Sequence, residues 1–189
     1  MFSNPIGVKS FEDRLRENPM FFNSYRYVVP TQYITNDGGV SDLPVRSGDN
    51  NNQGPYVDST SSAIYNKNVQ EVSFWIKKLG SPTGTATIAV WSNTASGGTK
   101  TNENTFGTID VSTLTGSYVK YTFDTGSHVM AVDDTIGLEF TGGDVSNNPQ
   151  IRGDLTDAYD GTDTQRGRYS GGAWSPVDSH DCDFEIGYI

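Results

Sequence analysis

Two alternating runs between Val69 and Trp91 constrain the fold more than any other stretch of this sequence. Each run has apolar side chains at every second position, namely Val72, Phe74 and Ile76, then Ala86, Ile88 and Val90. Ser81-Pro82-Thr83 joins the runs between two glycines. Alternation with a period of two, bounded by Gly and Pro, is typical of half-buried antiparallel strands. A turn centred near Pro82 would place both apolar sets on one wall of a core.

The same alternation places Trp75 and Trp91 together on the opposite face of this strand pair. A large aromatic side chain on the solvent face of a sheet needs a second layer, a ligand or another chain to cover it. We therefore take both tryptophans as candidate interface residues.

Further short alternating runs follow as far as the C-terminus. They are TFGTIDVS, SYVKYTFD, His128–Val132, DDTIGLEFTGG, PQIRG, QRGRYS and CDFEIGYI. Roughly eight to ten strands separated by turns predict an all-β antiparallel sandwich of the jelly-roll type. The predicted core also includes Ile136, Leu138, Phe140, Phe184 and Ile186. Cys182 is the only cysteine and falls in the last alternating run, so we expect a small core residue and no disulfide.

The N-terminal third differs from the rest in composition. We expect residues 1–59 to form an extended arm and residues 60–189 to form the sandwich. Ser10 as N-cap and Asn18-Pro19 as stop signal predict one short helix at residues 11–17. Residues 36–62 have the composition of a loop. The apolar residues of the arm are candidate contacts with the body or with another subunit: Phe11, Leu15, Phe21, Phe22, Tyr25 and Tyr27.

Charge and hydropathy exclude some classes of partner. The formal net charge is −10 and the basic residues do not cluster, which argues against direct nucleic-acid binding. No apolar run approaches the length of a membrane span, and the N-terminus has no apolar export signal. A sandwich of this surface type that starts at its own Met and lacks an export signal fits assembly inside a cell, followed by release as part of a particle.

Four segments resemble a carbohydrate-binding-module-like jelly roll. They are FWIKKLGSPTGTATIAVW, TFGTIDVSTLTGSYVKYTF, DTIGLEFTGGD and YDGTDTQRGRYSGGAW. Domains of this kind recur in archaeal and bacterial surface proteins and in virus structural proteins. The resemblance covers roughly residues 60–189 and implies a binding or assembly module. It leaves residues 1–59 unexplained.

Two ligand sites are candidates. Asp154, Asp157, Asp160 and Asp163 fall in one loop with Gly161, a set of hard oxygen donors that could bind Ca²⁺. The spacing is not that of an EF-hand, and aspartates also occur in turns because they bond nearby backbone N–H groups. A glycan could stack on Trp174, Tyr159 or Tyr169, with Arg168 bonding its hydroxyls; Trp174 is expected on a loop. The alternative for the aromatic residues is burial or a subunit contact.

Catalysis has little support in the sequence. A glycoside hydrolase needs two carboxylates facing each other across the bond. Glu71, Glu139 and Glu185 have outward-facing phases on predicted strands, and His128 and His180 stand outside any catalytic motif. We expect a non-enzyme.

The functional hypothesis is a structural, assembly-forming virion protein, such as a capsid, decoration, turret or tail-associated subunit. Its partners would be copies of itself and other structural subunits of the particle. The alternative is a glycan-binding module of a cell surface or an extracellular adhesion protein, which would bind cell-surface glycans. A glycoside hydrolase is a remote alternative.

Overall fold

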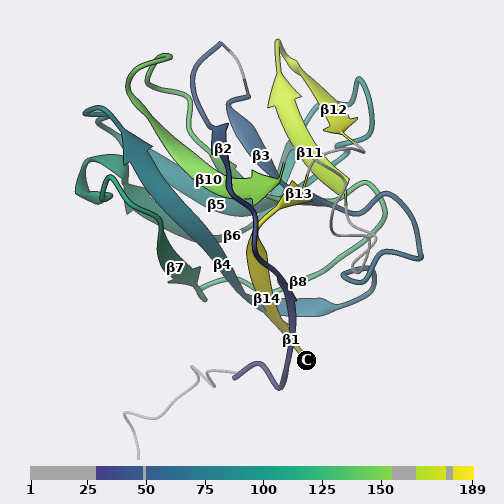
Figure 1. The fold of residues 1–189 in the computed structure, drawn as a ribbon. Helices are drawn as coiled ribbons and strands as arrows, with labels where there is room; N and C mark the ends of the chain where they lie inside the picture. Colours follow the sequence, from purple (N-terminus) through teal and green to yellow (C-terminus); the bar gives the residue numbers. More distant parts are fainter. Residues whose placement is uncertain (1–28, 49, 155–164, 178–180) are drawn as a thin grey trace, which may run out of the picture.

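The computed structural model describes residues 29–48, 50–154, 165–177 and 181–189. These residues form two antiparallel β-sheets that pack face to face, one behind the other in Figure 1. The predicted all-β antiparallel sandwich is thereby confirmed. The helix predicted at residues 11–17 lies outside the described residues.

The eight-stranded sheet is organised around β4 (Asn68–Leu79), its longest strand. Along one edge of β4 lie β14 (Phe184–Tyr188) and β10 (Asn148–Asp154), and along the other lie β7 (Val119–Phe123) and β8 (His128–Val129). The sheet is completed by β1 (Gln32–Asn36) on β14, and by β2 (Ser41–Pro44) and β13 (Asp181–Cys182) on β10.

The six-stranded sheet has the order β12-β11-β3-β9-β5-β6. Its strands are β3 (Asn52–Tyr56), β5 (Thr85–Ser92), β6 (Thr101–Asp110), β9 (Thr135–Glu139), β11 (Gln165–Ser170) and β12 (Ala173–Val177). A short 3-10 helix, η2 (Val111–Thr113), follows β6, and the Asp110 carboxylate caps it by accepting from the Ser112 N–H at 2.9 Å.

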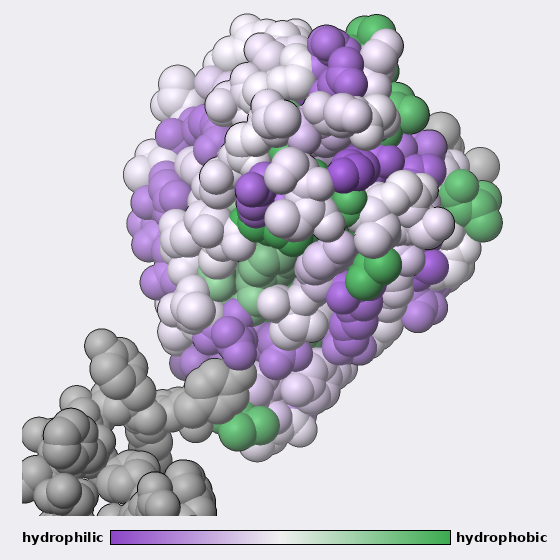
Figure 2. Space-filling view, turned by 90° about the vertical axis from the view of Figure 1, so that its left-hand side faces the viewer, coloured by the Kyte–Doolittle hydropathy of each residue, from purple (hydrophilic) through white to green (hydrophobic). Residues whose placement is uncertain are grey.

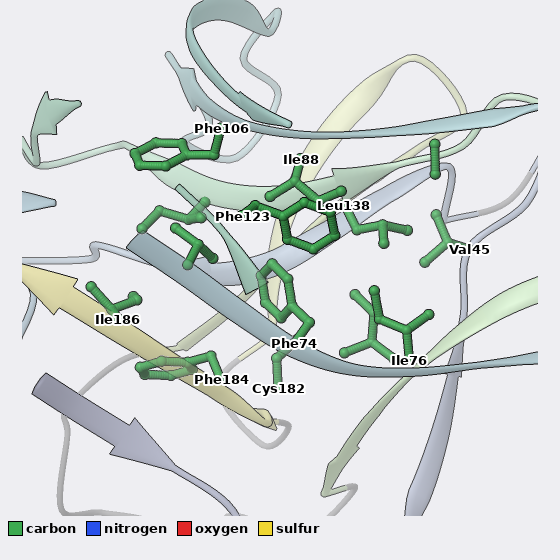
Figure 3. Close-up of a cluster of buried hydrophobic side chains, with 14 of the residues drawn as sticks. Val45, Phe74, Ile76, Ile88, Phe106, Phe123, Leu138, Cys182, Phe184 and Ile186 are labelled. Carbon is green, nitrogen blue, oxygen red and sulfur yellow. The ribbon is translucent and has the colours of Figure 1, made fainter. Parts of the chain in front are cut away.

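The core lies between the two sheets. Figure 3 shows Phe74 and Ile76 of β4 directed toward Ile88 of β5 and Leu138 of β9. Every predicted core position is at most 2% exposed: Val72, Phe74, Ile76, Ile88, Val90, Ile136, Leu138, Phe140, Phe184 and Ile186. Cys182 is a buried free thiol, as predicted. The period-two reading of these runs is therefore confirmed.

The connection between β4 and β5 differs from the prediction. The two strands do not pair, because β4 belongs to the eight-stranded sheet and β5 to the six-stranded sheet. Their apolar sets therefore line opposite walls of the core. Face-to-face sheets lie about 10 Å apart, a gap that residues 80–84 cross. Gly80 has a φ of 65°, and a Cβ there would lie 2.2 Å from the Ser146 carbonyl oxygen, so the crossing requires glycine. Trp75 and Trp91 consequently lie on outer faces of different sheets, not together.

The predicted boundary near residue 60 is also corrected. Residues 32–56 supply β1, β2 and β3, and β3 pairs with both β11 and β9 inside the six-stranded sheet. The sandwich therefore begins well before residue 60.

Within the described residues, no helix has the length and apolarity needed to cross a membrane.

Candidate functional site

The outer face of the eight-stranded sheet centres on Trp75. The indole of this β4 residue is half-buried. The guanidinium carbon of Arg152 lies 4.7 Å from its ring centroid, and the Nζ of Lys120 lies 5.6 Å from it. Cations at these distances from an indole face are attracted to its π electrons. We call the surface formed by Trp75, Lys120, Arg152, Lys77, Asp42, Tyr118 and Glu185 the Trp75 face.

Opposite charges surround this indole. Lys120 pairs with Glu185, and Lys77 Nζ lies 2.7 Å from Asp42 Oδ1. The Tyr118 hydroxyl donates to the same Asp42 oxygen at 2.7 Å, and Lys77 also lies 4.6 Å from the Tyr118 ring centroid. Partial burial opposes ionisation of Asp42, but the bonds from Lys77 and Tyr118 outweigh it and lower the pKa of this carboxyl. The face therefore carries both signs of charge in fixed positions.

Arg152 is fixed by a buried carboxylate. Its Nε donates to Asp183 Oδ2 at 2.5 Å, and the backbone N–H groups of Gly38 and Gly39 donate to the same carboxylate at 3.1 to 3.2 Å. Asp183 thus ties the β1–β2 connection to the guanidinium that lies against Trp75. Of the three glutamates considered for catalysis, Glu71 and Glu185 lie on this sheet and Glu139 lies on the other.

The side of the molecule that carries β7 is shown in Figure 2, where apolar side chains lie recessed between polar ones. Within the described residues, β7 pairs with β4 and β6 pairs with β5, so each has one unpaired edge. The polar sequence of β6, with Asn102, Glu103 and Asn104, disfavours edge-to-edge pairing with another sheet.

The outer face of the six-stranded sheet carries a second aromatic cluster. Trp91 of β5 and Trp174 of β12 pack with Ala89, and Tyr169 of β11 packs against them. The Tyr169 and Trp174 rings meet edge to face with centroids 5.6 Å apart. Lys100 lies over this cluster and pairs with Glu139 of β9. Both indoles are nearly inaccessible, at 6% and 1% exposure.

Two glycines explain how strands so distant in the sheet meet. A Cβ at Gly54 would lie 1.8 Å from the Ile136 carbonyl oxygen. A Cβ at Gly167 of β11 would lie 2.6 Å from Thr135 Oγ1, although Thr135 belongs to β9, on the far side of β3. The sheet is therefore sharply bent at β3. This bend brings the β11–β12 pair over the outer face, where Trp174 reaches Trp91.

Several polar atoms in and beside this cluster are buried without a hydrogen-bonding partner. They are the indole nitrogens of Trp91 and Trp174 and both side-chain polar atoms of Asn52. Asn52 is fully buried, and its Oδ1 lies over Gly137, where a Cβ would be 2.0 Å from it. The great majority of buried polar groups in proteins have a hydrogen-bonding partner. The second cluster therefore has unused hydrogen-bonding capacity.

The predicted glycan-stacking residues lie in this cluster. Trp174 is on β12 and not on a loop, and its burial prevents it from stacking on a sugar in this structure. Tyr169 is half-buried against it, and Arg168 lies next to Tyr169 on β11 with its Nε buried. Tyr159 lies outside the described residues.

The predicted cation loop is described only at one end. Asp154 ends β10, where it is paired in register with Asp181 of β13. Asp157, Asp160 and Asp163 lie outside the described residues. In the described part of the chain, no three His, Cys, Asp or Glu side chains are grouped as metal ligands. The candidate contacts of the N-terminal arm also lie outside it: Phe11, Leu15, Phe21, Phe22, Tyr25 and Tyr27.

His128 is part of a structural loop contact. Its Nε2 lies 3.0 Å from Asp134 Oδ2, and the same oxygen accepts from the Ala131 N–H at 2.8 Å. Asp133 adopts a positive φ of 67°, and its Oδ1 accepts from the Tyr56 hydroxyl at 2.7 Å. The two aspartates thus stabilise the connection that leads into β9.

No protein-family profile, curated protein or solved structure matches this chain.

Proposed function

We propose that this chain is a structural, assembly-forming subunit of a particle such as a virion, and that the Trp75 face contacts its neighbours. The observation that supports this proposal is the half-buried Trp75 indole on an open sheet face, with Arg152 and Lys120 against it. Trp, Tyr and Arg are the residues most enriched among the energetic hot spots of protein interfaces. Here Trp75, Tyr118 and Arg152 occur on one face.

The charge pattern of this face suits a contact between copies of one chain. In a two-fold interface, the same patch on each of the two copies forms the contact, so the patch must be complementary to itself. Lys77, Lys120 and Arg152 alternate on the Trp75 face with Asp42 and Glu185. Two copies of the patch would therefore bring charges of both signs into contact. The apolar residues of 1–28 would add contacts, and the resemblance to jelly rolls of virus structural proteins belongs to this proposal.

The mass of the full chain in solution tests the proposal. We expect defined oligomers by sedimentation or mass photometry, and we expect Trp75→Ala to shift them toward monomer by at least tenfold in dissociation constant. Val145→Ala is the control, because Val145 is 68% exposed and lies in the connection between β9 and β10. A full chain that stays monomeric at high concentration would reject the assembly function.

Glycan binding is the second candidate, supported by the same indole. A half-buried indole beside a guanidinium offers a stacking surface and hydrogen-bond donors for a sugar ring. Titration of the full chain with soluble glycans would then change tryptophan fluorescence, and Trp75→Ala would abolish the change. A monomer that responds in this way favours the glycan module, whereas an oligomer without a glycan response favours assembly.

A further inference from the structure

The Lys100 side chain occupies a site that has the features of an ammonium receptor. Its Nζ lies 4.8 Å from the ring centroid of Trp91 and 4.7 Å from that of Tyr169, and it pairs with the Glu139 carboxylate. Aromatic faces within about 6 Å of a cation attract it electrostatically, and the attraction grows as water is removed. The Lys100 and Glu139 side chains are only 20% and 17% exposed. We call Trp91, Tyr169 and Glu139 the ammonium box.

The walls of the box do not depend on Lys100. Trp91, Glu139 and Tyr169 come from β5, β9 and β11 of one sheet, and β5 pairs with β9 along five consecutive positions. Trp174 supports the aromatic walls from behind through its contacts with Trp91 and Tyr169. Lys100, in contrast, lies outside the strands, at the end of the connection between β5 and β6. The three residues of the ammonium box thus lie on strands, whereas Lys100, which occupies the box, lies on a loop.

Asn52 supplies an independent indication that the box can hold a different occupant. It lies directly opposite Glu139 on β9 and directly opposite Tyr169 on β11. Its side chain is fully buried, and its Oδ1 acceptor has no hydrogen-bonding partner. A primary ammonium has three N–H donors. Lys100 leaves this acceptor unused, and an ammonium that is not tethered to residues 99 and 101 could reach it as well as Glu139.

We propose that the ammonium box is a binding site for a primary alkylammonium group, and that Lys100 is its resident competitor. An entering ammonium displaces the Lys100 side chain and takes its place between the two rings. Burial lowers the pKa of Lys100, which is consistent with an occupant that can be exchanged. The shared chemistry fits a free amine as well as the lysine side chain of another polypeptide. This site lies on the sheet opposite to the Trp75 face, so it stands independently of the proposed assembly function.

Displacement also has a structural consequence for the connection that carries Lys100. The Gly97 N–H donates to the Trp174 carbonyl at 3.0 Å, and the Thr94 N–H donates to the Asp133 carbonyl at 3.0 Å. Lys100 is a further anchor of this segment. Binding of an external ammonium removes this anchor, so the segment should loosen while the sandwich stays folded.

The experiment uses Lys100→Ala in the full chain with n-propylammonium chloride, which matches the Cγ–Nζ atoms that the substitution removes. We expect saturable quenching of tryptophan fluorescence and a raised melting temperature, with an affinity at least tenfold higher than for the unsubstituted chain. n-Propanol and equimolar sodium chloride are the matched controls and should do neither. Nα-acetyl-lysine amide then distinguishes the sources: binding equal to that of propylammonium indicates a peptide lysine, and its failure indicates a free amine.

Two further variants keep the test decisive. Adding Glu139→Gln to Lys100→Ala should weaken propylammonium binding at least tenfold, whereas adding Val119→Ala, an exposed position on the other sheet, should leave it unchanged. If Lys100→Ala does not fold, Lys100→Met takes its place, because methionine retains the volume of the lysine stem. Propylammonium is then also titrated against the unsubstituted chain, with the Glu139→Gln variant as the control. The proposal is overturned if no saturable response occurs, or if propanol acts as strongly as propylammonium.

Discussion

Phe74 connects the alternation of the sequence with the stability of the fold. Its side chain is fully buried, and it lies directly opposite Phe184 on one neighbouring strand and Tyr121 on the other. Phe74→Ala removes most of a ring from a packed interior and leaves a cavity. We expect a loss of about 3–5 kcal/mol in the free energy of unfolding. Urea unfolding measures this loss.

Val119→Ala is the control for this substitution, because Val119 lies on β7 in the same sheet and is 41% exposed. Its effect should stay within about 0.5 kcal/mol. Equal losses in the two variants would contradict the assignment of Phe74 to the core.

Cys182 provides a prediction about pH. Burial raises the pKa of its thiol to about 12, from 9.0 in a solvated thiol. Above pH 9 the unfolded chain loses this proton while the folded chain keeps it, so folding is opposed as pH rises. The contribution to stability is complete below the unfolded pKa and disappears as pH approaches 12.

The difference between the native chain and Cys182→Ala isolates this effect from other groups that titrate in alkali. Between pH 7.5 and 9.5 the free energy of unfolding should fall about 1 kcal/mol more for the native chain than for the variant. Parallel pH profiles would show that the thiol is not protected from solvent.

At the scale of elements, the sequence predicts faces better than it predicts partners. The period of two in β4 and β5 correctly assigns Phe74 and Ile88 to the core, because alternation alone decides which side of a strand is apolar. It does not decide whether the next strand pairs beside it or crosses to the other sheet. That choice depends on the connection, here residues 80–84. The need for glycine at Gly80 arises from the Ser146 carbonyl oxygen, which is distant in sequence and packs against it in the fold.

The strands that local sequence pattern does not predict have an unfavourable composition. β2 and β3 read SDLP and NQGPY, with Pro and Gly in segments that resemble loops. β3 is nevertheless buried at all five positions. Gly54 is needed there because neighbouring backbone approaches it, so the residue that weakens the strand signal is the one that the bent sheet requires. Tertiary contact overrides local propensity at this strand.

Gly54→Ala tests the bend directly. A Cβ at this position would lie 1.8 Å from one backbone atom and 2.9 Å from another, and backbone cannot move away as a flexible side chain can. We expect a loss above about 3 kcal/mol, or failure to fold. Gly116→Ala is the control, because nothing lies within 4 Å of a Cβ there. Thermal melting of both variants distinguishes them, and an unperturbed Gly54→Ala would contradict the bend.

The ammonium box could not be predicted from local pattern, because its three residues come from three separate strands and its occupant comes from a fourth segment. The alternation predicts Trp91 on an outer sheet face, where another layer must cover it, and Tyr169 is a candidate glycan contact. Lys100 and Glu139 have no motif around them, and Lys100 follows a loop of Ser, Gly and Thr. The cover predicted for Trp91 comes from β12 of the same chain. The alternation in the sequence predicts that Trp91 needs a covering partner, and the sheet topology provides Trp174 as that partner.

At the scale of the whole molecule, the two outer faces differ in what covers them. The β11–β12 pair folds over the outer face of the six-stranded sheet and buries its tryptophans. In the described part of the chain, the tryptophan of the eight-stranded sheet is covered only in part, by side chains of its own sheet. The Trp75 face is therefore the better candidate for a contact with another molecule.

The position of β3 also predicts how truncated chains behave. A chain of residues 60–189 lacks β1, β2 and β3, and β3 lies between β11 and β9 in the six-stranded sheet. Without β3 the β11–β12 pair has no partner strand on its other edge, and the backbone hydrogen bonds of β9 on that edge are lost. Residues 29–189, in contrast, retain every described strand.

We therefore expect residues 29–189 to show a β-type circular dichroism spectrum and one cooperative melting transition, and residues 60–189 to show neither. A folded 60–189 fragment would contradict the role assigned to β3. Once 29–189 is shown to fold, its mass can be compared with that of the full chain. If oligomers persist in 29–189 and disappear in the same chain with Trp75→Ala, the sheet face suffices for assembly. If they disappear on removal of residues 1–28 alone, the aromatic residues Phe21, Phe22, Tyr25 and Tyr27 contribute the decisive contacts.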